Sequence, residues 1–475
     1  MTRLRNIGPE GHILAIGHLL FAGLFVLASI HHVERCIHVD SANQIFKWVQ
    51  LDGVEVEAYR FAAIFPQLIV KVVRLFSVDL NTLLWVASVA HVLVPYIIFV
   101  LTAHVFRTPW IAAGCALAAV LCTRLTFYGI VLEANYLLCY PFLLAGVIHG
   151  PLRKGATAGT LLILALALFL VLAVHPVGFL VALFVIVLLW PRLPEQRTIL
   201  VILGSVTVLW GGLARFLLPP SGYESGLYTA AAEGLDQVHR VSKLPSFDFL
   251  VGHTWHYTTH YLPLWALLVV LSVLLIRRRD IRVLAITWAG VVGYTALNVF
   301  TYHAGETAMM MEKNFLPLAT LVALPLLLAV GDLRSRWQSW AAVAFLAVSF
   351  IQFRGISFAS KPARERVMKI SALVSEVRAR GVRKAVVLER TLDDGGLHIH
   401  WALAFETMLY SAREGAESCV TVISSTDPPV IPPGKNVELS PFDARFHASD
   451  LDKRYFQLPE TAYVLIPDLD AGHLR

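Results

Sequence analysis

Charged residues are scarce in this chain. Only 15% of its 475 residues are Asp, Glu, Lys or Arg, whereas 57% are hydrophobic. A typical soluble domain is about 25% charged, so this composition argues against a chain built from soluble domains alone. The apolar residues gather into stretches almost free of charge, such as 161–174, 201–218 and 264–276. Because a helix of roughly 20 such residues crosses a bilayer core, the composition predicts a membrane protein with many spans.

The sequence also lacks the familiar motifs of soluble enzymes. Its five cysteines show no CxxC or other metal-ligand spacing. No Walker A, GxSxG, HExxH or GxGxxG pattern stands in a suitable context, so ATP-driven transport and Rossmann-type chemistry have no support. The net charge of +6 could indicate a nucleic-acid partner, but the distribution of the charges along the chain explains it better. We therefore expect no nucleic-acid partner.

The breaks between the apolar stretches alternate in character. One set is short and basic, and it contains Arg3, Arg5, Arg107, Arg153, Lys154, Arg192, Arg197, Arg277, Arg278, Arg279, Arg282, Arg334 and Arg336. The other set holds most of the acidic residues, at 31–80, 124–135, 219–261 and 301–314. Short loops rich in Lys and Arg stay in the cytoplasm. The alternation therefore predicts a cytoplasmic N-terminus and about eleven transmembrane helices, at 12–30, 83–105, 109–123, 131–149, 156–174, 177–190, 198–218, 262–276, 283–301, 315–331 and 338–353.

The composition changes after the last apolar stretch. From Lys361 the pattern predicts helices at 364–380 and 398–413 and strands at 384–388, 419–424 and 462–466, which indicates a small α/β domain. An odd number of spans places this domain on the outer face, which we expect to be the periplasmic face of a bacterial inner membrane. The predicted fold is an all-α polytopic membrane domain (1–355) with outer interfacial helices at 40–80, followed by an α/β soluble domain (361–475). The charged groups of that domain look like a solvated surface, and we assign it no catalytic residue.

The first outer loop contains the main candidate for a catalytic residue, Asp40. It precedes stretches at 42–50 and 60–73 in which apolar residues recur at helical spacing, as is typical of helices that lie in the membrane interface. An acidic side chain at the start of a helix can cap free N–H groups. The sequence therefore leaves two interpretations of Asp40 open, an N-cap and a functional carboxylate.

Three further candidates lie at the outer ends of predicted spans. Glu133 opens the fourth span, where an unpaired carboxylate is costly and often functional, although it could also be a solvated loop residue. Lys313 stands where the tenth span begins on the outer side, against the positive-inside trend. Snorkelling could explain this lysine, and a bound anion would explain it better. His175 precedes Pro176 at the end of the fifth span and is a weaker candidate, because a His-Pro pair usually marks a helix terminus.

The layout of these residues resembles that of the GT-C glycosyltransferases, which use polyprenyl-phosphate-linked sugars. This family includes protein O-mannosyltransferases and the aminoarabinose transferases of lipid A. The likeness consists of an acidic residue (Asp40) after the first span, a second (Glu133) near the start of the fourth, and an outer α/β domain at the C-terminus. In addition, the segment from Glu312 to Pro325 is similar to the family's Arg-Tyr-x-Leu-Pro-x-x-x-Pro-like start of a span. The chain departs from the pattern at Ser41, where a second acidic residue is common, and at Lys313-Asn314, where Arg-Tyr is common.

The resemblance implies a membrane enzyme that moves a sugar from a polyprenyl phosphate to an acceptor on the outer face. Asp40 would be the general base, and Arg60 and Lys313 would bind the donor phosphate. Glu133 would orient the acceptor or hold a divalent cation, Mg²⁺ or Mn²⁺, together with Asp40. The weaker candidates for the site are His38, His175, His303 and Glu312. The implied partners are the lipid-linked sugar and membrane lipids, and the acceptor stays open.

Two other classes of function remain. A transporter or flippase of a lipid-linked intermediate would need polar residues in mid-span, whereas nearly all the charges here lie at the ends of spans. A non-catalytic assembly subunit with the same fold is the second alternative, because the second acidic residue after Asp40 is missing.

Overall fold

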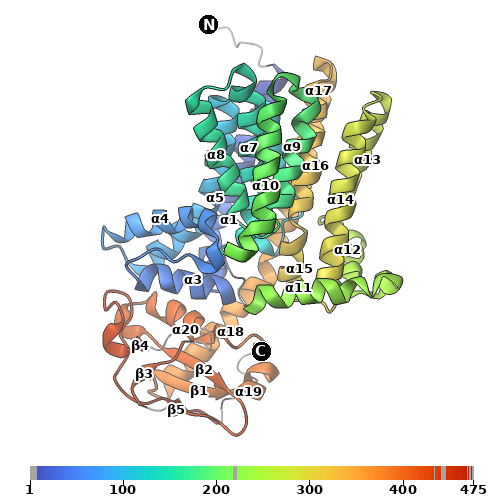
Figure 1. Ribbon diagram of the computed structural model, residues 1–475. Helices are drawn as coiled ribbons and strands as arrows, with labels where there is room; N and C mark the ends of the chain where they lie inside the picture. Colours follow the sequence, from blue (N-terminus) through green and yellow to red (C-terminus); the bar gives the residue numbers. More distant parts are fainter. Residues whose placement is uncertain are drawn as a thin grey trace.

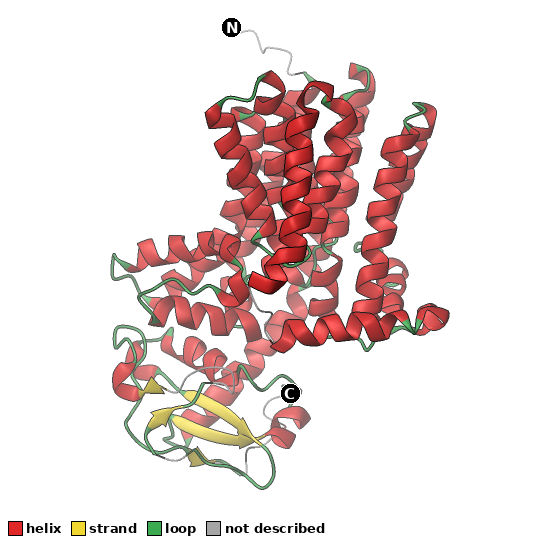
Figure 2. Cartoon of the chain, in the orientation of Figure 1, coloured by secondary structure: helices red, strands yellow, loops and turns green. Residues whose placement is uncertain are grey.

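A bundle of helices with a small α/β domain at one end makes up the protein (Figures 1 and 2). The computed structural model describes residues 8–217, 222–432, 434–439, 446–467, 469 and 472. Arg3 and Arg5, the first of the basic residues used to predict the topology, lie outside these residues. The bundle is helical throughout, and Figure 2 shows strands only in the small domain.

Each of the eleven apolar stretches contains one helix of the bundle. These helices are α1 (Pro9–Ile30), α5 (Leu80–Val100), α6 (Pro109–Ala118), α7 (Tyr140–Val147), α8 (Ala158–Leu172), α9 (Gly178–Leu189), α10 (Arg197–Leu217), α13 (Leu262–Arg277), α14 (Ile281–Thr301), α16 (Pro317–Gly331) and α17 (Ser335–Phe358). In Figure 1 the long helices stand alongside one another, with α13 and α14 toward one side.

Fewer helices reach spanning length than the eleven predicted. Among the described residues, six helical stretches are long and apolar enough to cross a bilayer, and they are Pro9–Ile30, Leu80–Val105, Pro194–Leu213, Ile281–Thr301, Ala308–Gly331 and Ser335–Ala379. The chain is therefore a multi-pass membrane protein. The remaining stretches hold shorter helices because local breaks interrupt them. Cys122, for example, has a positive φ of 64° just beyond α6, and the 3-10 helix η5 (Glu133–Leu138) takes up the first part of the stretch that ends in α7.

Shorter helices gather at the end of the bundle near the α/β domain. The predicted interfacial helices correspond to α3 (Val39–Gln50) and α4 (Ile64–Arg74), which follow α2 (His32–Cys36) and are joined by the 3-10 helices η1 (Glu57–Tyr59) and η2 (Phe61–Ala63). The outward side of α4 exposes apolar residues: Phe65, Leu68 and Val72, continuing to Leu75 and Phe76. Three further helices lie at this end, α11 (Gly222–Leu235), α12 (Pro245–Trp255) and α15 (Ala308–Phe315).

The C-terminal domain has the predicted α/β character. Its parallel sheet has the order β2-β1-β5, from β1 (Lys384–Leu388), β2 (Thr421–Ser425) and β5 (Val464–Leu465). Lys384 pairs with Thr421, and Ala385 pairs with Val464. The helices are α18 (Ser360–Ala379), α19 (Glu389–Asp394) and α20 (Leu403–Ala412), and β3 (Asn436–Val437) pairs with β4 (Phe446–His447) in a small antiparallel ribbon.

This domain packs directly against residues 31–80, the predicted first outer loop. The ring of Phe46, in α3, lies 5.4 Å from that of Phe405 and 5.1 Å from that of Phe456, centroid to centroid. At the edge of this contact, Arg74 of α4 donates to Asp452 at 2.8 Å. The α/β domain therefore shares a hydrophobic core with α3 and holds the segment that follows Asp40.

Candidate functional site

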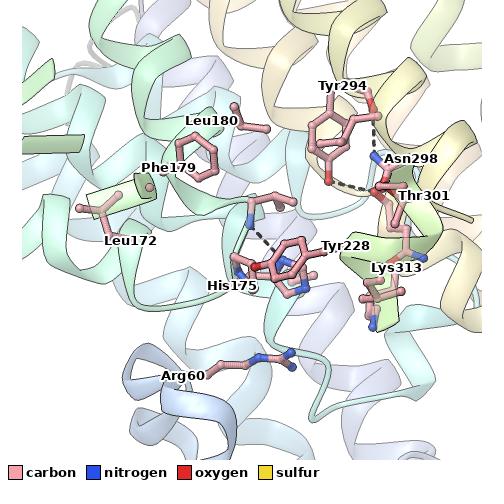
Figure 3. A pocket seen from close by; sticks show the side chains of 18 of the residues that line it. Arg60, Leu172, His175, Phe179, Leu180, Tyr228, Tyr294, Asn298, Thr301 and Lys313 are labelled. Atoms are coloured by element: carbon pink, nitrogen blue, oxygen red, sulfur yellow. Dashed lines mark hydrogen bonds between the residues drawn. The ribbon is translucent and has the colours of Figure 1, made fainter. Parts of the chain in front are cut away.

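A cavity of about 540 Å³ opens in the bundle beside the short helices (Figure 3). Its lining combines a polar end with an apolar wall. The polar lining residues include Tyr59, Arg60, His175, Asn298, Lys313 and Asn314, and the apolar ones include Leu172, Phe179, Leu180, Trp210, Leu227 and Leu297. In Figure 3, Arg60 and Lys313 lie at one end of the view, and Phe179 and Leu180 lie toward the other. The cavity thus offers positive charge at one end and a hydrophobic surface beyond it.

Lys313 places a positive charge on the cavity wall. It lies in the last turn of α15, and its side chain is buried, with 7% of the residue exposed. Within the described part of the chain its ammonium group makes no ion pair or hydrogen bond, and Glu133, Arg60 and Asp40 all act on it electrostatically. Burying an ammonium group without a direct partner is costly. This arrangement is therefore typical of a site that receives an anion.

Arg60 and Glu133 form an ion pair next to Lys313. Arg60 Nη1 lies 2.8 Å from Glu133 Oε2, and each side chain is only 15% exposed. Arg60 follows Tyr59, which has a positive φ of 58°, and Glu133 begins η5. Glu133 has no cation near it in the sequence, and the fold supplies one from the first outer loop. Glu133 is therefore not a solvated loop residue.

Asp40 is the second residue of α3 and does not cap it. The N-cap is His38, whose side chain makes no capping hydrogen bond, and the free N–H of Val39 donates to Glu406 of the C-terminal domain, so the N-cap interpretation of Asp40 is wrong. In the described structure Asp40 makes no hydrogen bond or ion pair. Burial raises the pKa of its carboxyl group to about 6, opposed by the nearby charge of Lys313 and reinforced by that of Glu133. Asp40 itself does not line the cavity, and of the charges that act on it Lys313 is the one on the cavity wall.

His175 joins this group although the sequence makes it a weak candidate. It lines the cavity in the connection between α8 and α9, where the N–H of Val177 lies 3.4 Å from its Nδ1. Burial lowers the pKa of this imidazole well below its usual value, and the charges of Arg60 and Lys313 lower it further. His175 is therefore neutral at physiological pH and can offer a hydrogen bond without adding charge.

Glu312 has a structural role instead. Its fully buried carboxylate accepts hydrogen bonds from the backbone N–H groups of Arg124, Leu125 and Thr126 and from the Thr126 hydroxyl, at 2.6 to 3.1 Å. These contacts occupy both oxygens of the Glu312 carboxylate, and they fix the loop after α6 against α15. Glu312 does not line the cavity.

The other two weak candidates also lie away from the cavity lining. His303 forms a hydrogen bond through Nδ1 with the carbonyl oxygen of Phe300 at 3.1 Å, so its ring stabilises the turn after α14. His38 stands at the start of α3 near Arg366 and Glu406 of the C-terminal domain, and burial lowers its pKa to about 4. Neither residue lines the cavity.

Several lining residues were not anticipated from the sequence. Asn298 and Tyr294 lie one turn apart in α14, where the Asn298 amide donates to the Tyr294 carbonyl at 3.0 Å. The Tyr294 hydroxyl donates to the Asn314 carbonyl at 3.0 Å, which links α14 to the segment after Lys313. Tyr228 of α11 also lines the cavity. The i, i+4 spacing of Tyr294 and Asn298 in an otherwise apolar helix is the signal that could have revealed them.

The side chains beside the cavity do not form a metal-binding set. Among the described residues, no group of three or more His, Cys, Asp or Glu side chains is placed to hold a metal ion. Glu133 is already paired with Arg60, which leaves Asp40 as the remaining carboxylate of the predicted pair. A cation shared by Asp40 and Glu133, as the sequence predicts, would compete with Arg60 for the Glu133 carboxylate, and the roles proposed for the site are those of the chain's own side chains.

No protein-family model matches this chain, and no curated protein or solved structure matches it significantly. The likeness to GT-C glycosyltransferases therefore depends on the chain's own residues. The geometry of the cavity is the further observation on which a proposal about function can be based.

Proposed function

We propose that this protein is a membrane glycosyltransferase of the GT-C type, which moves a sugar from a polyprenyl phosphate to an acceptor on the outer face. The observation that carries the proposal is the cavity, which has Arg60 and Lys313 at one end and an apolar wall at the other, with Asp40 within electrostatic range of Lys313. A lipid-linked sugar has the same distribution of properties, an anionic head joined to a hydrocarbon chain.

The size of the cavity supports this ligand class. Pockets for small molecules are typically about 300–1,000 Å³, and this one is about 540 Å³. That space suits the sugar, the phosphate and the first part of the lipid, whose apolar groups would contact Leu180 and Trp210. The rest of a long tail would remain in the membrane.

The charged side chains at and near the cavity suggest how the transfer reaction would proceed. The lipid phosphate leaves the anomeric carbon as the acceptor oxygen or nitrogen attacks, so one bond to that carbon forms while its bond to the phosphate oxygen breaks. Asp40 accepts the proton of the acceptor. Arg60 and Lys313 stabilise the negative charge that gathers on the departing phosphate. Glu133 orients Arg60 through their ion pair.

We also propose the finer topology: eleven crossings, a cytoplasmic N-terminus, and a C-terminal domain in the periplasm of a bacterial inner membrane. The alternation of basic and acidic loops supports this orientation. A phosphatase active only in the periplasm, fused after Arg475, should therefore be active, and the same reporter fused in the basic loop at Arg279 should be silent. The reverse pattern would contradict the orientation.

Removing the charge of Lys313 should weaken donor binding. We expect Lys313→Met to bind a short polyprenyl phosphate roughly 10- to 100-fold more weakly, the effect of losing one charge-assisted contact of about 1.5–3 kcal/mol. The dissociation constant of this polyprenyl phosphate, measured on the purified protein in detergent, tests the prediction. Lys361→Met is the matched control, because that side chain is 81% exposed and pairs locally with Glu365. Equal binding by the Lys313 variant and the wild type would show that the phosphate lies elsewhere.

Asp40→Asn should remain folded and lose transfer activity. The amide keeps the size of the side chain and removes its basicity, so we expect transfer to be at least about a hundredfold slower. Donor binding should stay nearly unchanged. Asp52→Asn is the control from the same loop, since the Asp52 side chain is 97% exposed. Full activity of Asp40→Asn would contradict the mechanism, and intact lipid binding without any transfer in the wild type would favour the flippase or the assembly subunit.

The pH dependence of transfer should report the buried carboxyl group. Asp40 acts only when it is deprotonated, and burial raises its pKa to about 6. The value of kcat/KM should therefore be constant near neutral pH and fall as the pH drops through about 6, approaching tenfold per pH unit below it. Any residual activity of Asp40→Asn should lack this limb. A wild-type profile that stays flat to pH 4.5 would mean that Asp40 is not the base.

A further inference from the structure

A buried ion pair of the C-terminal domain has a third partner outside that domain. Glu406 of α20 is fully buried, and it accepts from Arg366 of α18 at 2.6 Å (Nε) and 2.7 Å (Nη2). The same carboxylate accepts the backbone N–H of Val39 at 2.9 Å. Val39 belongs to the first outer loop and directly precedes Asp40 in the chain. The contact thus runs from the soluble domain to the residue beside the general base.

The backbone of Val39 has a conformation that needs such support. Its φ is +37°, in the left-handed region that β-branched side chains rarely adopt. Strained residues of this kind persist where the surrounding structure holds them. Val39 is 6% exposed, so water has little access to replace the carboxylate as the acceptor of its N–H. Glu406 therefore fixes the peptide group from which α3 and Asp40 continue.

We propose that the Arg366–Glu406 pair is a positioning device for Asp40, through which the C-terminal domain sets the geometry of the active site. The proposal rests on the proposed function in that it takes Asp40 to be the base. Arg366 orients the Glu406 carboxylate with two hydrogen bonds, and the carboxylate holds the N–H of Val39. Glu406 is a positioning residue, because its oxygens are occupied by these donors.

A second ion pair provides a matched comparison. Arg74 and Asp452 also join the first outer loop to the C-terminal domain, at 2.8 Å, and both side chains are largely buried, with 9% and 13% exposed. Arg74 is the last residue of α4, and among the described residues neither Arg74 nor Asp452 forms a hydrogen bond or ion pair with Val39 or Asp40. Disrupting this pair weakens the docking of the domain without removing the acceptor of the Val39 N–H.

The test uses the full-length protein and replaces each pair by apolar residues of similar size. Such replacement of a buried ion pair is often neutral for stability, whereas removing one partner leaves an unpaired buried charge. Arg366→Met with Glu406→Leu should remain folded and raise the hydrogen–deuterium exchange of the amides at residues 39–44. Transfer should fall on the order of 10- to 100-fold in kcat, the effect of a displaced catalytic group, with the KM for the lipid donor nearly unchanged. Arg74→Met with Asp452→Leu should change neither the exchange at 39–44 nor kcat.

A third variant separates positioning from simple destabilisation. Glycine adopts a positive φ readily, so adding Val39→Gly to the Arg366→Met, Glu406→Leu protein should recover part of the lost kcat. A role limited to the stability of the domain predicts no recovery. Unchanged exchange at 39–44, unchanged kcat, or the same loss in the Arg74–Asp452 variant would overturn the proposal. If the wild type transfers no sugar, the proposed function fails, and the exchange measurement still decides whether Glu406 holds this segment.

Discussion

The ion pair between Arg60 and Glu133 is the contact on which the rest of the site depends. Arg60 comes from the turn between two 3-10 helices of the first outer loop, and Glu133 begins η5 ahead of α7. Their contact at 2.8 Å brings the segment between α3 and α4 against the bundle and places a guanidinium group at the cavity. With each side chain 15% exposed, solvent screens the pair only in part, so separating it would leave two poorly hydrated charges. Lys313 and His175 line the same cavity beside Arg60.

The sequence predicted those features that have a local signature. The apolar stretches mark the helices of the bundle, and the alternation of helical and strand patterns marks the C-terminal sheet, so β1 begins and ends where the pattern predicts. The number of spanning helices was predicted less well, because composition does not show where a backbone turns. Cys122 and η5 lie within or beside apolar stretches of the sequence, yet α6 ends at Ala118, before Cys122, and α7 begins only after η5.

The site was predicted in part for a related reason. Asp40, Glu133, Arg60 and Lys313 stand out because a charge beside an apolar stretch is unusual, and the structure brings their charges into mutual range. Glu312 stands out in the same way, but three backbone N–H groups satisfy its carboxylate, and no spacing in the sequence reveals that. The apolar wall of the cavity comes from α8, α9, α10, α11 and α14, so it exists only once those helices pack.

Under the proposed function, the apolar side of α4 would set the depth of the donor phosphate relative to the lipids. This side exposes Phe65, Leu68 and Val72, followed by Leu75 and Phe76. Such a surface is typical of a helix that lies at the boundary between acyl chains and headgroups. Arg60 immediately precedes η2 and α4, so its guanidinium is anchored to that same level. A lipid phosphate occupies this level in any bilayer. A lipid-linked donor would therefore enter the cavity laterally from the bilayer, with its phosphate at the depth of Arg60. Its tail would stay in the hydrocarbon core throughout.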